Sequence, residues 1–471
     1  MIEGEVFMKF SINNEVFINL TNSFGHTWSV QERDLQKYQK HILNAAEEVR
    51  NIRSAGKGPA GELVLFPHLP YILDESLLMT DSERDKLDKL DILGKKQDAV
   101  ISIGIGGSYL GNQALFDIFC GSYWNHFSSE ERNRYPLIYF AGQNADSASI
   151  TDLIRQLRRS CHQKKRKLKV LLLLISKSGS TMEPMLAFQI LSRNLVDFCE
   201  LSVVAITNQN KGKIHELAEK NQWTCFNMPE GIGGRFSIFS QVGLVFSKFI
   251  GLDIKKFLSG AKMVEESCRS EKWSENPALA MAAIKFIAMK EYGVSAEVIM
   301  PYGDKFRAVG WWYAQLLGES LGKKLDIHGN IVHNGRTPVS CVGTTDMHSL
   351  TQEHQQGRKN KLLQFISEQE ENKDIDVVCE ESGKHGIIKL SKVLSAALHA
   401  NEKALADDGR MSCHVSMRTV TPFHVGAIMY FFFLATAYEG AMAGINSYDQ
   451  PGVEDYKKIL HSYLSRCTEK V

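Results

Sequence analysis

The sequence LLLLISKSGSTMEP, residues Leu171–Pro184, places an unbroken apolar run directly before a polar loop and a helix start. A short apolar run without alternation is typical of a strand that is buried on both faces, as in parallel sheets. Ser180 and Glu183 have the spacing of a capping box, and Pro184 fits a helix only within its first turn. The stretch therefore predicts a strand, a hydroxyl-rich loop and a helix in succession.

The loop between this strand and this helix has the groups that bind an anion. It offers hydroxyl groups, the ammonium group of Lys177 and backbone N–H groups at the positive end of a helix dipole. Phosphate is the anion that we expect. When this stretch is taken alone, a serine-rich turn that only caps the helix fits the same residues equally well.

Composition indicates an ordinary globular chain of two domains, or one large domain with an internal repeat. The 471 residues are 44% hydrophobic and 23% charged, with a formal net charge of +1. This balance gives no reason to expect nucleic acid or a membrane surface as a main partner. The basic run at 158–169 has no interleaved aromatic residues, so we expect a solvated loop there.

The cysteines and the N-terminus indicate a cytoplasmic chain. Nine cysteines without a CxxC motif or paired metal-like spacing are typical of reduced thiols. The N-terminus has no apolar region of the kind found in signal peptides. The apolar segment 425–438 is too short for a bilayer core, which takes roughly 20 residues, so we expect a buried core helix.

Further strand and helix patterns alternate along the chain. In the first part, buried strands are expected at 99–103, 137–140, 169–175 and 201–207. A second series begins with a strand at 296–301 and continues with a helix at 310–317 and a strand at 338–342. This alternation predicts an α/β protein with doubly wound parallel sheets, whose ligands bind at the carboxyl ends of the strands.

A glycine-rich loop, GIGGSYLG at 104–111, follows the strand at 99–103. Absent side chains let backbone N–H groups approach a ligand closely. A dinucleotide site is the competing interpretation, but the spacing is not GxGxxG and no acidic residue ends a second strand at the usual distance. Because this loop and the serine-rich loop both follow strand ends, phosphate binding is favoured.

Two charged residues are candidates for chemistry because of their neighbours. Gly233 and Gly234 precede Arg235 in a tight turn, where an arginine is either part of a structural ion pair or a donor that faces an anion. Glu319 is expected just after an apolar helix and between glycines, which makes it a candidate base, although an exposed glutamate also fits. A lone histidine such as His348 is usually a core or capping residue.

Three segments together resemble one family, the glucose-6-phosphate isomerases. They are GIGGRFSIFS (231–240), QLLGESLGK (315–323) and NSYDQPGVEDYKK (446–458), and ISIGIGGSYLG, SKSGST and GTTDMHS fit in the same order. The resemblance spans about residues 101–458. It implies two sugar-isomerase-type (SIS) α/β subdomains with doubly wound parallel sheets and a C-terminal helical segment. We place an N-terminal helical or irregular segment at 1–95, the subdomains at 96–245 and 246–424, and the C-terminal helices at 425–471.

The resemblance also implies roles for individual residues. Glu319 is similar to the family's catalytic base, His348 to the residue that helps open the sugar ring, and Arg235 to the arginine that stabilises the enediolate. Lys457 matches a residue that acts at ring opening or at the substrate oxygens, and Gln450 one that contacts the substrate. The residues that resemble the family's sugar- and phosphate-binding loops are Gly107, Ser108, Ser176, Lys177, Ser178, Thr181 and Gly234.

The implied reaction is the reversible isomerisation of glucose 6-phosphate and fructose 6-phosphate through ring opening and a cis-enediol intermediate. One base suffices, because it takes a proton from C2 and returns it to C1. A positioned base supplies about 10²–10⁴-fold, roughly 3–5 kcal/mol, so a fixed cation has to stabilise the enediolate as well, and Arg235 suits this role. The sequence has no HExxH motif or clustered metal ligands, so we expect no metal and no cofactor.

Two alternatives remain open: a dual glucose/mannose-6-phosphate isomerase, and a non-catalytic sugar-phosphate-binding SIS protein. The second would have no use for Glu319, His348 and Lys457. The chain resembles the compact bacterial members, has Gly179 where longer members carry a bulkier residue, and does not align over 360–415. The resemblance further implies a homodimer in which His348 reaches the neighbouring subunit's active site.

Overall fold

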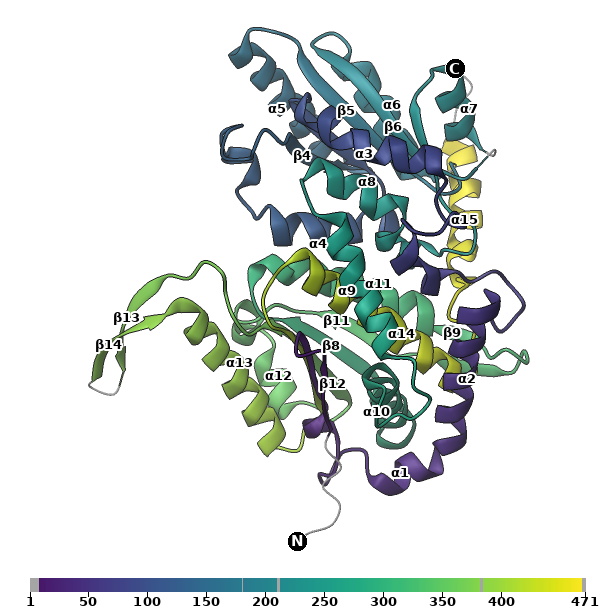
Figure 1. The fold of residues 1–471 in the computed structure, drawn as a ribbon, viewed down its shortest axis with the longest axis vertical. Coiled ribbons are helices and arrows are strands. Elements are labelled where there is room, and N and C mark those ends of the chain that lie inside the picture. Colours follow the sequence, from purple (N-terminus) through teal and green to yellow (C-terminus); the bar gives the residue numbers. More distant parts are fainter. Residues whose placement is uncertain (1–7, 180, 210–211, 382–383, 468–471) are drawn as a thin grey trace.

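The computed structural model of the protein describes residues 8–179, 181–209, 212–381 and 384–467, and it contains two main sheets in separate halves of the molecule (Figure 1). The first sheet has the order β4-β3-β5-β6-β7, and every neighbouring pair is parallel. Its strands are β3 (Ala99–Ile103), β4 (Leu137–Ala141), β5 (Leu168–Ile175), β6 (Cys199–Thr207) and β7 (Thr224–Asn227). We call this sheet with its helices the first half.

The second sheet has the order β1-β2-β15-β12-β8-β11. Its parallel strands are β8 (Ala296–Pro301), β11 (Thr337–Ser340), β12 (Lys361–Glu368) and β15 (Ser412–Met417). The N-terminal hairpin of β1 (Lys9–Ile12) and β2 (Val16–Asn19) joins the sheet antiparallel to β15. We call this sheet with its helices the second half. The expected α/β class with doubly wound parallel sheets is confirmed.

The two sheets share one topology. In the first sheet, β3 pairs with β4 on one side and with β5 on the other; in the second sheet, β8 pairs with β11 on one side and with β12 on the other. The strand order therefore reverses between β3 and β5, and again between β8 and β12. Ligands of open α/β sheets bind beyond the carboxyl ends of the strands at such reversals.

Helices cover both sheets and fill the space between them. Those of the first half are α4 (Leu110–Phe119), α5 (Ser147–Lys164), α6 (Met182–Leu195) and α7 (Lys213–Lys220). The others are α1 (Glu32–Lys37), α2 (Gln39–Ala55), α3 (Asp81–Lys95), α8 (Gln241–Phe249), α9 (Ile254–Ser267), α10 (Pro277–Tyr292), α11 (Arg307–Leu321), α12 (Thr351–Gln356), α13 (Leu390–Asp407), α14 (Pro422–Met442) and α15 (Gly452–Cys467). Two short hairpins, β9–β10 (Lys323–Leu325 and Ile331–Asn334) and β13–β14 (Asp376–Glu381 and Lys384–Lys389), complete the fold.

The deepest part of the core is α14, which packs against α2, α9 and α10. Among the described residues it is the one helix with the length and composition to cross a membrane, and 94% of its most apolar window is buried inside the fold. The expected core helix at 425–438 is therefore confirmed.

Three local expectations need correction or completion. Most of the basic run at 158–169 is not a loop: residues 158–164 end α5, a short turn follows, and β5 starts at Leu168. Cations are favourable at a helix C-terminus, and Lys164 and Arg166 pair with Asp98. The helix expected at 310–317 extends over Arg307–Leu321, so Glu319 lies in its last turn. The expected capping box includes Ser180, which lies outside the described residues.

The segment 360–415, which sequence comparison left unaligned, supplies much of the second half. It forms β12, the β13–β14 hairpin, α13 and β15 in that order. The hairpin projects away from the body of the molecule (Figure 1). The second sheet therefore depends on this segment for two of its parallel strands.

Candidate functional site

The two loops that the sequence predicts to bind phosphate lie at the reversal point of the first sheet. After β3, residues Gly106–Ser108 form a short 3-10 helix, η3, that leads into α4. After β5, Ser176 is buried, and the hydroxyl groups of Ser176 and Ser178 lie 3.5 and 3.4 Å from that of Thr181. Thr181 is the N-cap of α6 but makes no side-chain cap hydrogen bond. Its hydroxyl therefore joins those of Ser176 and Ser178 at the helix N-terminus, a position that favours an anion.

The segment 232–234, just before Arg235, contacts both loops. A Cβ atom on Gly107 would lie 1.9 Å from the carbonyl oxygen of Gly234, so only glycine permits this contact. The Lys177 ammonium group donates to the carbonyl of Ile232 at 2.8 Å. Burial lowers the pKa of Lys177 from its ordinary value. Gly107, Gly234 and Lys177, which the sequence predicts as substrate-binding residues, thus lie around one short segment.

Arg235 is the buried cation at the centre of the site. It belongs to η5 (Gly234–Phe239), and its Nε donates to the Ser320 hydroxyl at 2.7 Å. One terminal nitrogen, Nη1, donates to Gln450 Oε1 at 2.7 Å and lies 3.4 Å from Glu319 Oε2. The other, Nη2, donates to the carbonyls of Ser447 and Asp449. Burial lowers the pKa of Arg235, and the Glu319 carboxylate opposes this shift.

Glu319 faces Arg235 from the last turn of α11 and is 28% exposed. Its other oxygen, Oε1, accepts a hydrogen bond from Gln315 Nε2 at 2.9 Å. A Cβ atom on Gly106 would lie 3.0 Å from this same nitrogen, so Gln315 sits between the glycine-rich loop and the carboxylate. Gln315 is not among the residues predicted from the sequence; its spacing of four residues from Glu319 on one helix was the available signal.

Lys323, which also is not among the residues predicted from the sequence, fixes the end of α11. Its side chain is 5% exposed, and its Nζ donates to the carbonyls of Glu319 at 2.8 Å and Asp449 at 2.5 Å. Nζ also pairs with the Asp449 carboxylate at 3.0 Å. Burial lowers the pKa of Lys323, and Asp449 opposes this shift. Lys323 therefore connects the helix that carries Glu319 to the loop that carries Gln450.

Two of the predicted catalytic residues are not joined to this cluster by a hydrogen bond or ion pair in the described part of the chain. His348 is an exposed residue at the end of η7 (Thr345–His348). Lys457 is 43% exposed on α15 and pairs with Glu454 at 2.8 Å. Within the described part of this chain, neither makes a hydrogen bond or ion pair with Arg235 or Glu319.

The assembled geometry suits sugar-phosphate chemistry. A half-buried carboxylate and a buried guanidinium face each other across 3.4 Å, and a hydroxyl-rich loop at a helix N-terminus lies on the same side of the sheet. Such a pair can take up a proton and stabilise the anion that forms. Over the described residues, no group of three or more histidine, cysteine or acidic side chains is arranged to hold a metal ion.

Comparisons with known proteins identify relatives over nearly the whole chain. The family model described as Phosphoglucose isomerase matches residues 89–470. A glucose-6-phosphate isomerase of Fusobacterium nucleatum is 32% identical over 447 residues, which cover 93% of each chain. Another, of Carboxydothermus hydrogenoformans, is 30% identical over 461 residues, 96% of this chain and 94% of the relative.

Solved structures share the fold. The crystal structure of a glucose-6-phosphate isomerase from Chlamydia trachomatis has a TM-score of 0.80 at 21% identity, covering 99% of this chain and 92% of its own. A hypothetical protein, TT0462 from Thermus thermophilus, has a TM-score of 0.74 at 24% identity, covering 92% and 96%. The six ordered motifs predict the family of this chain. The match to the family model and the identity with the two relatives confirm that prediction. The chain belongs to the phosphoglucose isomerase family.

Proposed function

We propose that this chain interconverts glucose 6-phosphate and fructose 6-phosphate, with Glu319 as the base and Arg235 as the electrostatic stabiliser of the enediolate. The observation that carries the proposal is the contact between these two groups beside the glycine-rich loop. The names of the relatives and the family supply the substrate.

The chemistry follows from how the groups are held. The phosphate binds at the loop of Ser176, Ser178 and Thr181, and the reacting carbons extend toward Glu319. The carboxylate takes the proton from C2 and returns it to C1, so it ends each cycle ionised. Arg235 is already fixed by Ser320, Gln450 and two backbone carbonyls, so it needs no reorganisation as negative charge develops on the substrate oxygens.

The remaining predicted groups act at ring opening or at the substrate oxygens. Lys457 belongs to the same chain, on α15, and Gln450 contacts the substrate from the loop that Lys323 holds. His348 is contributed by a second copy of the chain, which fits its exposure and its lack of a hydrogen bond with Glu319 in the described part of one subunit. Seven of the nine cysteines are shown as free thiols, which supports a reducing compartment, the cytoplasm, as the place of action.

The homodimer has further support in the β13–β14 hairpin. Val378 and Ile387 lie directly opposite each other in its register and are 74% and 77% exposed. Apolar side chains paired on one face of a projecting hairpin are typical of a surface that another protein covers. A second copy that covers this surface would complete the dimer.

A coupled assay tests the activity directly. The purified chain should convert glucose 6-phosphate to fructose 6-phosphate and back, with product detected by a linked dehydrogenase or kinase. Mannose 6-phosphate, offered in parallel, separates a dual enzyme from a glucose-specific one. Absence of turnover with every one of these substrates would refute the proposed function.

Mixing two inactive variants tests the shared site. Glu319→Gln protein and His348→Ala protein, refolded together, should recover activity, because one site of each mixed dimer holds both intact residues. With random exchange half of the dimers are mixed, so about a quarter of all sites should recover. Mass spectrometry confirms that mixed dimers form. No recovery in proven mixed dimers would mean that both residues act within one subunit.

A further inference from the structure

The second sheet has a reversal point of its own, and the proposed reaction does not use it. It lies between β8 and β12, and a pocket of about 230 Å³ lies near it, between α13 and the carboxyl ends of β12 and β15. Its walls include Tyr302, just after β8, Ser367 and Gln369 at the end of β12, and Ser416 near the end of β15. The corresponding point of the first sheet carries the glycine-rich and serine-rich loops. The pocket shares no lining residue with the Arg235–Glu319 site.

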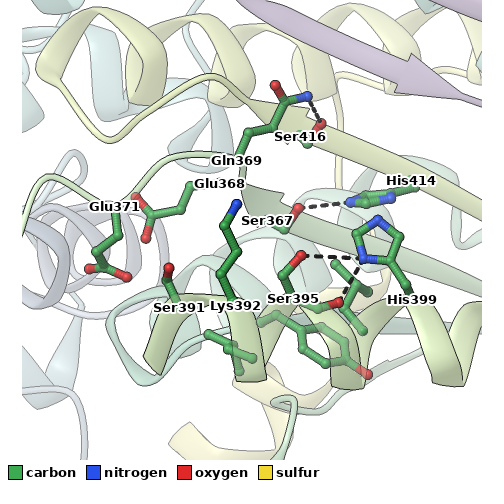
Figure 2. A pocket seen from close by; sticks show the side chains of 13 residues that line it. Ser367, Glu368, Gln369, Glu371, Ser391, Lys392, Ser395, His399, His414 and Ser416 are labelled. Atoms are coloured by element: carbon green, nitrogen blue, oxygen red, sulfur yellow. Dashed lines mark hydrogen bonds between the residues drawn. The ribbon is translucent and has the colours of Figure 1, made fainter. Parts of the chain in front are cut away.

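The opposite wall of the pocket is α13, as Figure 2 shows. Lys392 rises from this helix with its ammonium group directed toward the strand ends, near Ser367 and Glu368. It makes no hydrogen bond or ion pair with any described residue. Ammonium groups beside a pocket are favourable for an anion, because a charge-assisted hydrogen bond is stronger than a neutral one.

The other lysine near the pocket is already neutralised. Lys305 pairs with Glu368 and, at 2.8 Å, with Glu371. Both of these carboxylates line the pocket. The two lysines, Lys305 and Lys392, balance the charges of Glu368 and Glu371. Because Lys305 already pairs with both carboxylates, an anionic group on a ligand would face Lys392, and the carboxylates would remain as hydrogen-bond acceptors.

Two histidines are held in fixed orientations in the same walls. His414 Nε2 lies 2.8 Å from the Ser367 hydroxyl, and its Nδ1 lies 3.4 Å from a Glu402 carboxylate oxygen. His399 Nδ1 donates to the Ser395 carbonyl at 2.7 Å, which leaves its Nε2 for a ligand. Fixed imidazole, hydroxyl, amide and carboxylate groups are the partners that the hydroxyl groups of a polyol need.

We propose that this pocket binds a second small molecule, a polyol that carries one anionic group, with Lys392 at the anion and Glu368, Gln369 and His399 at the hydroxyl groups. The class includes sugar phosphates and sugar acids. The proposal does not depend on the activity of the Arg235–Glu319 site, because the two sites share no residue. It places a ligand of the second half between the end of β12 and α13, as the proposed function places one between β5 and α6 in the first half.

The test uses sorbitol 6-phosphate, a polyol phosphate without a carbonyl group that could be isomerised. Calorimetric titration of the full chain should detect a site that Lys392→Met weakens at least about tenfold, as expected when a charged hydrogen bond is lost. The same variant should keep the wild-type kcat for isomerisation. Lys403→Met is the matched control, because Lys403 lies on the same helix, outside the pocket, and pairs with Asp407.

Further arms separate the possible ligands. His399→Gln, at a second exposed position, should weaken the same site. Gluconate binding that depends on Lys392 would extend the ligand class to sugar acids, and its absence would restrict the class to sugar phosphates. Inorganic phosphate that binds as tightly as sorbitol 6-phosphate would overturn the polyol assignment. If no titrated site responds to either Lys392→Met or His399→Gln, the proposal is wrong.

Discussion

In the first half, β3 runs through the glycine-rich loop into α4; in the second half, β8 runs through Gly303 and a short 3-10 helix into α11. The two helices occupy equivalent places after the first parallel strand of their sheets, and they pack against each other. They meet the site with opposite ends. The start of α4 offers backbone groups beside the glycines, whereas the end of α11 offers the side chain of Glu319.

This difference separates binding from chemistry. A helix N-terminus and a side-chain-free loop suit a phosphate, and the first half has both. A carboxylate in the last turn of a helix meets the negative end of the dipole, so it needs cations nearby. Arg235 and Lys323 supply them, at 3.4 Å from the carboxylate and 2.8 Å from the backbone carbonyl of Glu319. In the proposed site, one topology thus supplies the phosphate-binding loop from one half and the base from the other.

The largest expected effect comes from removing the carboxylate that the second half supplies. Glu319→Gln keeps the shape of the side chain and its position beside Gln315, but it removes the base. We expect kcat to fall by about 10²–10⁴-fold while binding of the sugar phosphate survives. Steady-state kinetics and calorimetry measure the two quantities. Glu353→Gln, an exposed glutamate of the same half, is the control, and more than about a tenth of wild-type turnover in Glu319→Gln would refute its role as base.

The next largest effect concerns the core of the second half. Arg336 is buried between Glu297, at 2.7 Å, and Glu439, at 2.9 Å, and Lys285 pairs with Glu297 from the other side. Arg336→Met leaves the buried Glu439 without its ion-pair partner, although Glu297 keeps Lys285, so the free energy of unfolding should fall by about 3–5 kcal/mol. Urea unfolding measures the change. Arg155→Met, at an exposed ion pair, should cost less than about 1 kcal/mol; equal losses in both variants would contradict a special role for the buried network.

A smaller effect tests the first half. Ser176→Ala together with Thr181→Ala removes hydroxyl groups from the serine-rich loop and leaves Glu319 intact. We expect KM for the sugar phosphate to rise by about tenfold and kcat to change little, because phosphate contacts contribute equally to substrate and transition state. Ser149→Ala, on the surface of α5, should leave KM unchanged. If kcat falls and KM does not change, the loop acts on the reacting carbons instead.

The sequence predicted those parts of the fold whose signal is local. The strands at 99–103 and 296–301 have the predicted bounds, because each is a mostly apolar stretch that is followed by a glycine or an aromatic residue. The last turn of α11 was not predicted, because a glycine at position 318 is typical of a helix end. In the structure Gly318 lies within the helix. Contacts such as Arg235 with Gln450 join residues 215 positions apart, and no local pattern encodes them. The motifs nevertheless brought Arg235, Glu319 and Gln450 together by resemblance.

The smallest effect lies where the two helices meet. Asp117 on α4 accepts a hydrogen bond from Gln113 at 2.6 Å, and burial raises the pKa of Asp117 to about 6, although Gln113 and Arg307 of α11 oppose this shift. Because the folded state holds this proton more tightly than the unfolded state, stability falls as the pH rises from about 4 through 6. Asp117→Asn keeps the shape without the charge. Its melting temperature should exceed that of the wild type by about 1–3 °C at pH 8, and the difference should vanish near pH 4.

Asp152→Asn, on the exposed face of α5, should show no such pH dependence. A gain that is the same at every pH would indicate better packing rather than removal of a buried charge, and a loss at pH 8 would mean that the ionised carboxylate is stabilised across the contact between α4 and α11.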